Sequence, residues 1–332
     1  MIARRLSIAC VAVSLLTASN AGAQSPPKSG GFTAEGLKKL DERLKQGVEH
    51  KEYAGAVALL IRDGKVGYSR AVGMRDRETG DRMRTDAIFR IASMSKPITS
   101  VAAMILVEDG KLALDDPVAK YIPEFKDMKL LDGKAATHPM TVRHLLTHTA
   151  GLSYRFFGGP LSDLYAKAGV SDGLTQTEGT IADGARLLAA QPLAFEPGTS
   201  WQYSLATDVL GRVVEVASGK PLDEFFRERI FAPLKMNDTA FFLDPDKVGR
   251  LAVLYQAGEN HALTRAPERP IKTGTLVYSS TYQYKGPRTY FSGGAGLTST
   301  AGDYARFLQM LLNGGELDGV RVLKPETVKA MT

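Results

Sequence analysis

A serine and a lysine stand three residues apart at the start of an apolar internal helix, in the stretch Ile91-Ala92-Ser93-Met94-Ser95-Lys96-Pro97. The predicted helix ends at Asp109-Gly110, and Pro97 suits its first turn. Ser93 and Lys96 therefore lie on one face, about one turn apart, at a helix N-terminus. Residues spaced for a core-facing stripe follow them: Ile98, Val101, Ala102 and Ile105.

This arrangement predicts an activated nucleophile. A serine hydroxyl needs a neighbouring base, and a lysine buried at a positive helix end can lose its proton. The same helix end directs backbone N–H groups at an oxyanion formed beside Ser93. The alternative is that Ser93 only caps the helix, since a second pair with this spacing, Ser25 and Lys28, stands where no helix can form.

The N-terminal residues are typical of a secretory signal. Arg4 and Arg5 precede an apolar stretch over 6–16, and Ala21-Gly22-Ala23 offers a cleavage site before Gln24. The apolar stretch is too short to span a bilayer, and no later stretch is long enough. We therefore expect a periplasmic or secreted protein with no membrane span.

Cysteine content and charge exclude several classes of function. The only cysteine is Cys10, inside the predicted signal, so disulfides, zinc-thiolate sites and cysteine catalysis are excluded in the mature chain. Removing the signal takes two of 42 basic residues and none of 36 acidic ones, which leaves a net charge of +4. Such a mixed, weakly basic chain is not expected to bind nucleic acid.

Two histidines, His144 and His148, stand four residues apart on a predicted helix, a spacing that could hold a metal. The glutamate that follows the first histidine in metalloproteases is missing, so structural histidines are favoured. We expect neither a metal nor a cofactor.

The first third of the chain predicts a sheet flanked by helices. After a linker over 24–32, Thr33 can cap a helix whose apolar face carries Leu37 and Leu40. Apolar runs over 56–61 and 66–72 are joined by Asp63-Gly64, a strong two-residue hairpin signal. We therefore expect an antiparallel sheet with helices packed on it.

Helices and long loops are predicted over 114–289. A short helix is expected over 141–149, and a longer one from Leu205 is ended by Gly219 before Pro221 starts the next. The polar segment 257–289 is predicted to form a long loop over the cleft. Beyond it, Thr300 with Asp303 opens a helix that ends at Gly314-Gly315.

In combination, these motifs resemble the serine β-lactamase and penicillin-recognising superfamily, and more narrowly the class C β-lactamase-like hydrolases that include the family VIII esterases. The matching segments follow the family's order: 91–97, 144–152, Pro197-Gly198 with Tyr203-Ser204-Leu205, 293–297, 299–301 and 303–304. The resemblance implies that Ser93 is the acyl-accepting nucleophile and that Lys96 and Tyr203 share the acid–base work.

The sequence departs from the family pattern at two places, one of which bears on the substrate and the other on whether the chain is a full-length hydrolase. Leu205 stands where β-lactamases of this class usually carry an asparagine that contacts the lactam amide, which favours esters. Lys272-Thr273-Gly274 matches the family's third motif but precedes the 293–304 segment instead of following it, so we interpret it as a coincidence. We accordingly expect the C-terminal sheet strands to be missing and the sequence to be a truncated form of a longer hydrolase.

The sequence therefore predicts an α+β fold of the β-lactamase/transpeptidase type, with an α/β lobe over 33–113 and 290–332 and an inserted helical lobe over 114–289. The predicted activity is hydrolysis of carboxylic esters through an acyl-enzyme on Ser93, with Lys96 and Tyr203. One alternative is a β-lactamase or D-Ala peptidase acting on β-lactam or peptidoglycan-like substrates. An alternative of another class is a non-catalytic relative that binds peptidoglycan or a partner. No signal for an oligomeric state is present.

Overall fold

The computed structural model describes residues 31–258 and 262–332 and shows an α+β fold with several small antiparallel sheets. The predicted signal peptide, residues 1–23, and linker residues 24–30 lie outside the described residues. Within the described ranges, no helix has the length and apolar character needed to cross a membrane.

A three-stranded sheet follows the first helix. α1 (Ala34–Glu49) begins at Thr33, whose hydroxyl accepts the N–H of Gly36, as predicted. β1 (Gly55–Arg62) and β2 (Lys65–Asp76) pair around the predicted loop, in which Asp63 and Gly64 have φ values of 52° and 71°. Positive φ at both positions is what a type I′ hairpin turn requires. β3 (Asp81–Arg82) pairs with the far end of β2.

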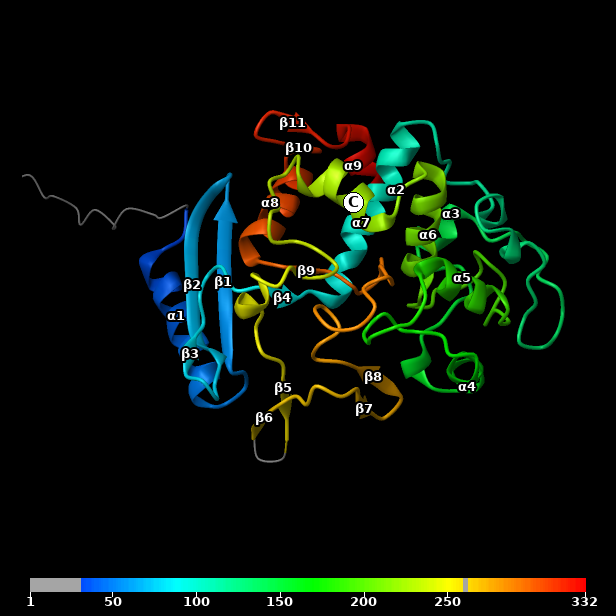
Figure 1. Cartoon of the computed structure of the whole chain (residues 1–332). Coiled ribbons are helices and arrows are strands. Elements are labelled where there is room, and N and C mark those ends of the chain that lie inside the picture. Colours follow the sequence, from blue (N-terminus) through cyan, green and yellow to red (C-terminus); the bar gives the residue numbers. More distant parts are fainter. Residues whose placement is uncertain (1–30, 259–261) are drawn as a thin grey trace, which may run out of the picture.

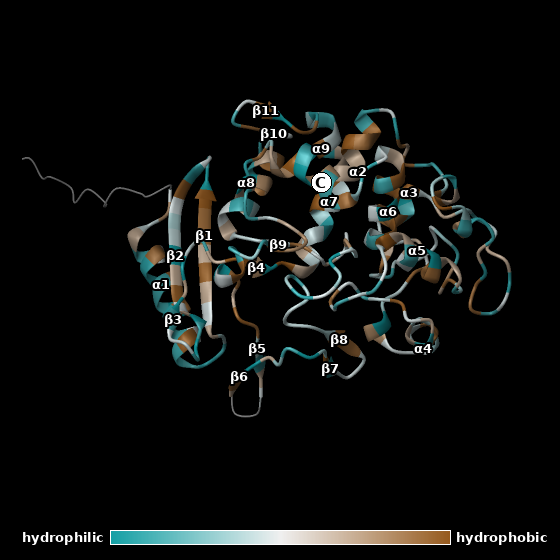
Figure 2. Ribbon diagram, viewed as in Figure 1, coloured by the Kyte–Doolittle hydropathy of each residue, from teal (hydrophilic) through white to brown (hydrophobic). Residues whose placement is uncertain are grey.

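Helices cover both faces of this sheet. α1 packs against β2, and α8 (Ala301–Leu312) packs against β1, so that the sheet stands between the two helices (Figure 1). β1 is apolar over most of its length (Figure 2), as a strand between two helical layers should be. α8 begins as predicted, with the Thr300 hydroxyl accepting the N–H of Asp303 at 3.1 Å.

The helix behind Ser93 lies at the centre of the fold. β4 (Phe89–Arg90) pairs with β9 (Thr298–Ser299), and from β4 the chain passes through η1 (Ala92–Met94) into α2 (Ser95–Glu108). α2 ends before Asp109-Gly110, as predicted. It packs against α6 (Ala206–Ser218) and α7 (Leu222–Phe226), which Figure 1 shows beside it.

The segment from 114 to 250 consists of helices and loops, which confirms the prediction for this part. α6 ends where Gly219 takes a left-handed φ of 73°. The remaining elements are η2 (Val118–Lys120), η3 (Pro123–Phe125), α3 (Val142–Leu146), η4 (Arg155–Phe157), α4 (Pro160–Lys167), α5 (Ile181–Ala189), η5 (Arg227–Phe231) and η6 (Val248–Arg250).

Two predictions for the middle of the chain were wrong in extent. The helix expected over 141–149 ends at Leu146, because His148 has a φ of 56°, which no α-helix accommodates. The segment 257–289 is not one long loop. It contains hairpins whose strands have three residues each, too few for a period to show in the sequence: β5 (Tyr255–Ala257) with β6 (Leu263–Arg265), and β7 (Ile271–Thr273) with β8 (Leu276–Tyr278).

The last described elements are a short hairpin and a helix. β10 (Glu316–Leu317) pairs with β11 (Val320–Arg321), and α9 (Pro325–Met331) starts at Pro325. The N–H of Lys324 donates to the Glu108 carboxylate at 2.7 Å, which fixes the start of α9 beside the end of α2.

One continuous apolar core joins the helices on both sides of α2. Side chains with no exposed surface come from α2, α6 and α8, among them Ile98, Val101, Leu106, Val209, Leu210, Val213 and Phe307. Full burial of a residue of this size contributes about 1.5–3 kcal/mol to folding. The core therefore holds the helix that carries Lys96 in a fixed place.

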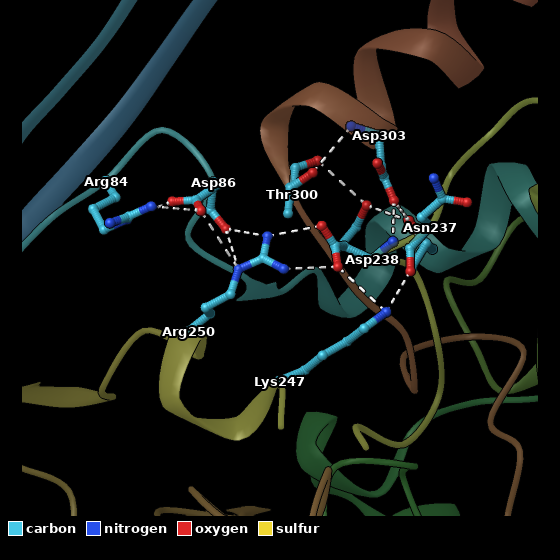
Figure 3. Close-up of polar contacts among 10 residues, drawn as sticks. Arg84, Asp86, Asn237, Asp238, Lys247, Arg250, Thr300 and Asp303 are labelled. Carbon is cyan, nitrogen blue, oxygen red and sulfur yellow. Dashed lines mark hydrogen bonds and ion pairs between the residues drawn. The ribbon is translucent and has the colours of Figure 1, made fainter. Parts of the chain in front are cut away.

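A polar network fixes the loop that leads into β4. The Arg250 guanidinium donates to both carboxylate oxygens of Asp238, at 2.8 and 2.7 Å, and to the backbone oxygen of Asp86 (Figure 3). Asp303, in the first turn of α8, accepts the N–H of Asp238 at 2.7 Å. The network thus ties the approach to Ser93 to the N-terminus of α8.

Candidate active site

Ser93 lies in the short turn of 3₁₀ helix between β4 and α2, and its side chain is exposed. The turn is anchored by the N–H of Ile91, which donates to the Leu297 carbonyl at 3.0 Å. Ala92 has a φ of 42°, a conformation that is uncommon for a residue with a Cβ. Such backbone strain persists only where the surroundings impose it.

Lys96 lies one turn further on and is almost fully buried, with 9% of its surface exposed. Its Nζ donates to Ser93 Oγ at 3.1 Å and to the Gly294 carbonyl at 2.8 Å. Among residues 31–258 and 262–332 no carboxylate forms an ion pair with Lys96, so these two acceptors hold its amine in one orientation, toward the serine.

Tyr203 reaches the same oxygen from the helical part of the molecule. Its hydroxyl donates to Ser93 Oγ at 2.6 Å, and its ring lies 4.6 Å from Lys96 Nζ. Tyr203 lies in a segment without regular structure that connects the Pro197-Gly198 turn to α6. This segment is held by a hydrogen bond in which the N–H of Gln202 donates to the His148 carbonyl at 2.9 Å. All three residues that the sequence singled out therefore meet at one atom.

The segment 293–297 forms the floor of the site and is fixed by polar side chains on the inner face of α2. Thr99 Oγ1 donates to the Gly293 carbonyl at 2.7 Å, and Ser95 Oγ accepts the N–H of Leu297 at 3.1 Å. These bonds hold the Gly294 carbonyl in place as the second acceptor for Lys96.

A buried carboxyl group lies beneath Gly294. Asp208 of α6 is 2% exposed, and its Oδ1 accepts the hydroxyl of Ser292 at 2.6 Å. Burial raises the pKa of Asp208 to about 6, although the Ser292 hydrogen bond and the Lys96 charge act in the opposite direction. A Cβ at Gly294 would lie 2.5 Å from Asp208 Oδ2, so only glycine fits between the carboxyl group and the lysine.

His148 completes the surroundings of Tyr203. The two ring centroids are 5.0 Å apart, and His148 Nδ1 lies 3.3 Å from Ser204 Oγ. Burial, with the Lys96 charge, lowers the pKa of His148 to about 4, so its imidazole is neutral at neutral pH. The ring packs against Tyr203 and adds no second cation to the site.

The metal alternative involved His144 and His148, and the structure separates their roles. His144 Nδ1 accepts the N–H of Thr141 in a capping box at the start of α3, whereas His148 lies beyond the end of that helix. Among residues 31–258 and 262–332 there is no group of three histidine, cysteine or acidic side chains that could hold a metal ion.

The structure shows where the two departures from the family pattern, Leu205 and Lys272-Thr273-Gly274, lie relative to the site. Leu205 precedes α6 and is 1% exposed, so its side chain is part of the core. Lys272-Thr273-Gly274 lies at the tip of the β7–β8 hairpin, and in the described part of the chain Lys272 makes no hydrogen bond or ion pair with Ser93, Lys96 or Tyr203.

Sequence reasoning missed the residues that support the site. Gly294 enters the prediction only as part of the matching segment 293–297, and Asp208 and Ser292 do not enter it. Asp208 could have been found from the sequence, because it lies three residues after Leu205 on the apolar stripe of its helix. A charged residue at such a position is buried, and burial of a charge indicates a special role. Nothing in the sequence singles out the Gly294 carbonyl as the partner of Lys96.

Fold and site together define a serine hydrolase of the β-lactamase/transpeptidase type. The sequence matches the Beta-lactamase family over residues 40–332, and the chain belongs to that family.

The relatives that this chain resembles are named for several different activities. Esterase EstB of Burkholderia gladioli is 40% identical over 278 residues, which cover 82% of this chain and 69% of the relative. A D-alanyl-D-alanine carboxypeptidase-like protein of Escherichia coli (strain K12) is 30% identical over 326 residues, 93% of this chain and 71% of the relative. Among solved structures, EstCE1, described as a hydrolase with promiscuous acyltransferase activity, superposes with a TM-score of 0.80 at 32% identity, covering 88% of this chain and 75% of that one.

Proposed function

We propose that this protein is a serine esterase that works through a covalent acyl-enzyme on Ser93. The observation that carries the proposal is the convergence of Lys96 Nζ and the Tyr203 hydroxyl on one serine oxygen, at 3.1 and 2.6 Å. A nucleophile within hydrogen-bond reach of its base, with the base held by a third group, is the general pattern of covalent catalysis. Here the Gly294 carbonyl holds the lysine.

The two half-reactions use the same three side chains. In the reactive form the Lys96–Tyr203 pair has already released one proton to solvent. Ser93 Oγ then attacks the ester carbonyl while its own proton passes to that pair, and backbone N–H groups at the start of α2 stabilise the oxyanion. Tyr203 then returns the proton to the leaving alkoxide, and the C–O bond breaks. Water attacks the acyl-enzyme with the same pair as base, which releases the acid and restores the serine hydroxyl.

Esters are favoured over β-lactams because Leu205 is buried in the core. The family resemblance assigns lactam-amide contact to an asparagine at this position, and a buried leucine supplies no such polar group. The similarity to an esterase at 40% identity points the same way.

Hydrolysis of a β-lactam or a D-Ala peptide is the second candidate, favoured by the similarity to a carboxypeptidase-like protein. A binding protein without catalysis is the alternative of another class.

We also propose that the protein acts in the periplasm or outside the cell. Support comes from the signal-like residues 1–23 and the absence of cysteine from the rest of the sequence. Expression in a bacterial host, followed by cell fractionation and N-terminal sequencing, tests this proposal. A cleaved chain in the periplasm or medium that begins at Gln24 supports it, and uncleaved protein in the cytoplasm contradicts it.

Steady-state kinetics on two chromogenic substrates separate the enzymatic candidates. We expect a short-chain nitrophenyl ester to be hydrolysed with a kcat/KM far above that for a chromogenic cephalosporin, and Ser93→Ala to abolish both reactions. Preference for the cephalosporin would favour the β-lactamase reading. Ester hydrolysis that survives in Ser93→Ala, or no turnover by folded protein, would overturn the esterase proposal.

A further inference from the structure

Five aromatic side chains form a continuous row of contacting rings beside Ser93, and we call this row the aromatic surface. The ring centroids of Trp201 and Tyr203 are 6.5 Å apart, those of Tyr203 and Tyr154 5.3 Å, those of Tyr154 and Phe156 4.6 Å, and those of Phe156 and Phe157 4.9 Å. Each separation lies within the range of favourable aromatic pairs. The rings come from two separate segments, Tyr154 with η4 and the residues that precede α6.

Both ends of the aromatic surface are open to solvent. Trp201 is 64% exposed and Phe157 is 51% exposed, whereas Tyr154, beneath the middle, is buried at 2%. Single exposed apolar residues are common on protein surfaces, but here two exposed rings are joined by a row of packed rings, and such an arrangement can bind another apolar group.

The aromatic surface is continuous with the catalytic constellation. Tyr203 is its central ring, and the hydroxyl of that ring lies 2.6 Å from Ser93 Oγ. Met94, next in the chain after Ser93, is 47% exposed and adds a flexible apolar side chain near the nucleophile. An ester whose carbonyl carbon reaches Ser93 is therefore close enough to place one of its two substituents against these rings.

The polar groups around the aromatic surface pack on its central rings, so the rings open for stacking are those of Trp201 and Phe157 at its two ends. His148 packs between Trp201 and Tyr203, with ring centroids 6.4 and 5.0 Å away, and its imidazole is neutral. Arg155 is paired with the buried Asp172 at 3.4 Å. Lys96 lies within 5.5 Å of the ring centroids of Tyr154 and Tyr203, and its charge is directed to Ser93 and Gly294. A charged substrate group would find no free counter-ion among these residues.

We propose that the aromatic surface binds a flat aromatic group carried by the ester, so that the enzyme prefers aryl or arylmethyl esters to small aliphatic ones. The chemical step in this inference rests on the proposed esterase function, whereas the binding step can be tested without it. Aromatic stacking at one or two rings corresponds to a preference of about threefold to tenfold over an aliphatic group of similar size.

The sequence offers a direct probe of binding, because Trp201 is its only tryptophan. In Ser93→Ala, which lacks the nucleophile, titration with benzyl acetate should shift the Trp201 emission to shorter wavelength in a saturable manner, as water is displaced from the exposed indole. Cyclohexylmethyl acetate, matched in size but not aromatic, should bind at least threefold more weakly. No saturable change with benzyl acetate, or equal affinity for the two esters, would overturn the inference.

Kinetics on variants test whether bound aryl groups are productive. In Phe157→Ala, the ratio of kcat/KM for benzyl acetate to that for ethyl acetate should fall at least threefold. Leu312→Ala removes a side chain that is 76% exposed on α8, away from the aromatic surface, and should leave the ratio as in the wild type. Thermal unfolding of both variants checks that they fold. An unchanged ratio in folded Phe157→Ala would contradict the inference.

The two proposals fail in different ways. If Ser93→Ala binds benzyl acetate but the wild type hydrolyses no ester, the esterase function is wrong and the aromatic surface stands as a binding site. If the wild type hydrolyses ethyl acetate as well as benzyl acetate and the emission of Trp201 does not change, the esterase function stands and the aromatic surface has no role in substrate choice.

Discussion

The hydroxyl of Tyr203 lies 2.6 Å from Ser93 Oγ, although 110 residues separate the two positions in the chain. Lys96 Nζ donates to the same oxygen at 3.1 Å and lies 4.6 Å from the centroid of the tyrosine ring. The phenol is therefore in position to exchange a proton with the serine.

Replacing Tyr203 with phenylalanine tests this relationship. Tyr203→Phe keeps the ring against His148 and removes only the hydroxyl, so we expect kcat on a nitrophenyl ester to fall by about 10²–10⁴-fold, the usual worth of a positioned acid or base. KM should change little, and calorimetry should show a melting temperature close to that of the wild type. A kcat within threefold of the wild type would show that Tyr203 is not part of the proton path.

The space at Gly294 is the second testable feature. In Gly294→Ala, the new Cβ would lie 2.5 Å from Asp208 Oδ2 and would push the segment that holds Lys96 out of place. We expect a loss of about 1–3 kcal/mol in the free energy of unfolding and a fall in kcat, measured by denaturant titration and ester hydrolysis.

Gly249→Ala is the matched control for this change. A Cβ at Gly249 would meet nothing within 4 Å, so stability and kcat should both stay near the wild-type values. If Gly294→Ala behaves like Gly249→Ala, the contact between Gly294 and Asp208 does not constrain the site.

Asp208 should make stability depend on pH in a direction opposite to that of most carboxyl groups. Burial raises its pKa from 3.8 to about 6, so the folded state binds its proton more tightly than the unfolded state does. The contribution of Asp208 to stability is therefore fully present below about pH 4 and is lost as the pH rises through about 6. A shift of this size corresponds to about 3 kcal/mol as an order of magnitude.

Asp208→Asn removes this titration. The free energy of unfolding of the variant minus that of the wild type should rise by about 2–3 kcal/mol between about pH 4 and pH 7, and should stay constant above that range. Urea titrations across these pH values measure the difference. The groups that face Asp208 are present in both proteins and cancel in the comparison: Lys96, Tyr154, Asp172, Tyr290 and Ser292. A difference that does not change with pH would contradict the raised pKa.

His148 should titrate far below an ordinary histidine. Burial and the Lys96 charge lower its pKa from 6.5 to about 4, so the neutral imidazole is favoured in the folded state. The stability that this provides is fully present above about pH 6.5 and is lost as the pH falls toward 4. NMR of the imidazole protons, assigned by comparison with His148→Gln, measures the midpoint directly. A midpoint near 6.5 would show that the ring is solvated and not packed against Tyr203.

Elements with long or strongly marked patterns could be predicted from the sequence. The hairpin at Asp63-Gly64, the end of α2 at Asp109 and the Thr300 cap of α8 were all confirmed, because turn chemistry and capping act within a few residues. The hairpins formed by β5 to β8 were missed, since strands of three residues carry no detectable period. The left-handed conformation of His148 was missed because a single residue with positive φ leaves no signal in the spacing of apolar residues.

The three side chains that converge on one oxygen could be predicted from the sequence, whereas the groups that hold them could not. Ser93 and Lys96 were joined by helical spacing, and Tyr203 was added by family resemblance; the structure brings the three together. The Gly294 carbonyl, which orients Lys96, is a backbone group, and backbone groups leave no mark in a sequence. The same holds for the aromatic surface, whose rings come from segments that are adjacent only in the folded chain.

Covalent labelling tests the central claim most directly. The folded wild type is treated with a fluorophosphonate probe, and the intact mass and the labelled peptide are determined by mass spectrometry, with Ser93→Ala alongside. We predict one adduct per chain, located on Ser93, and no adduct on the variant. An adduct on another residue, equal labelling of Ser93→Ala, or no labelling of folded protein would contradict a nucleophilic Ser93.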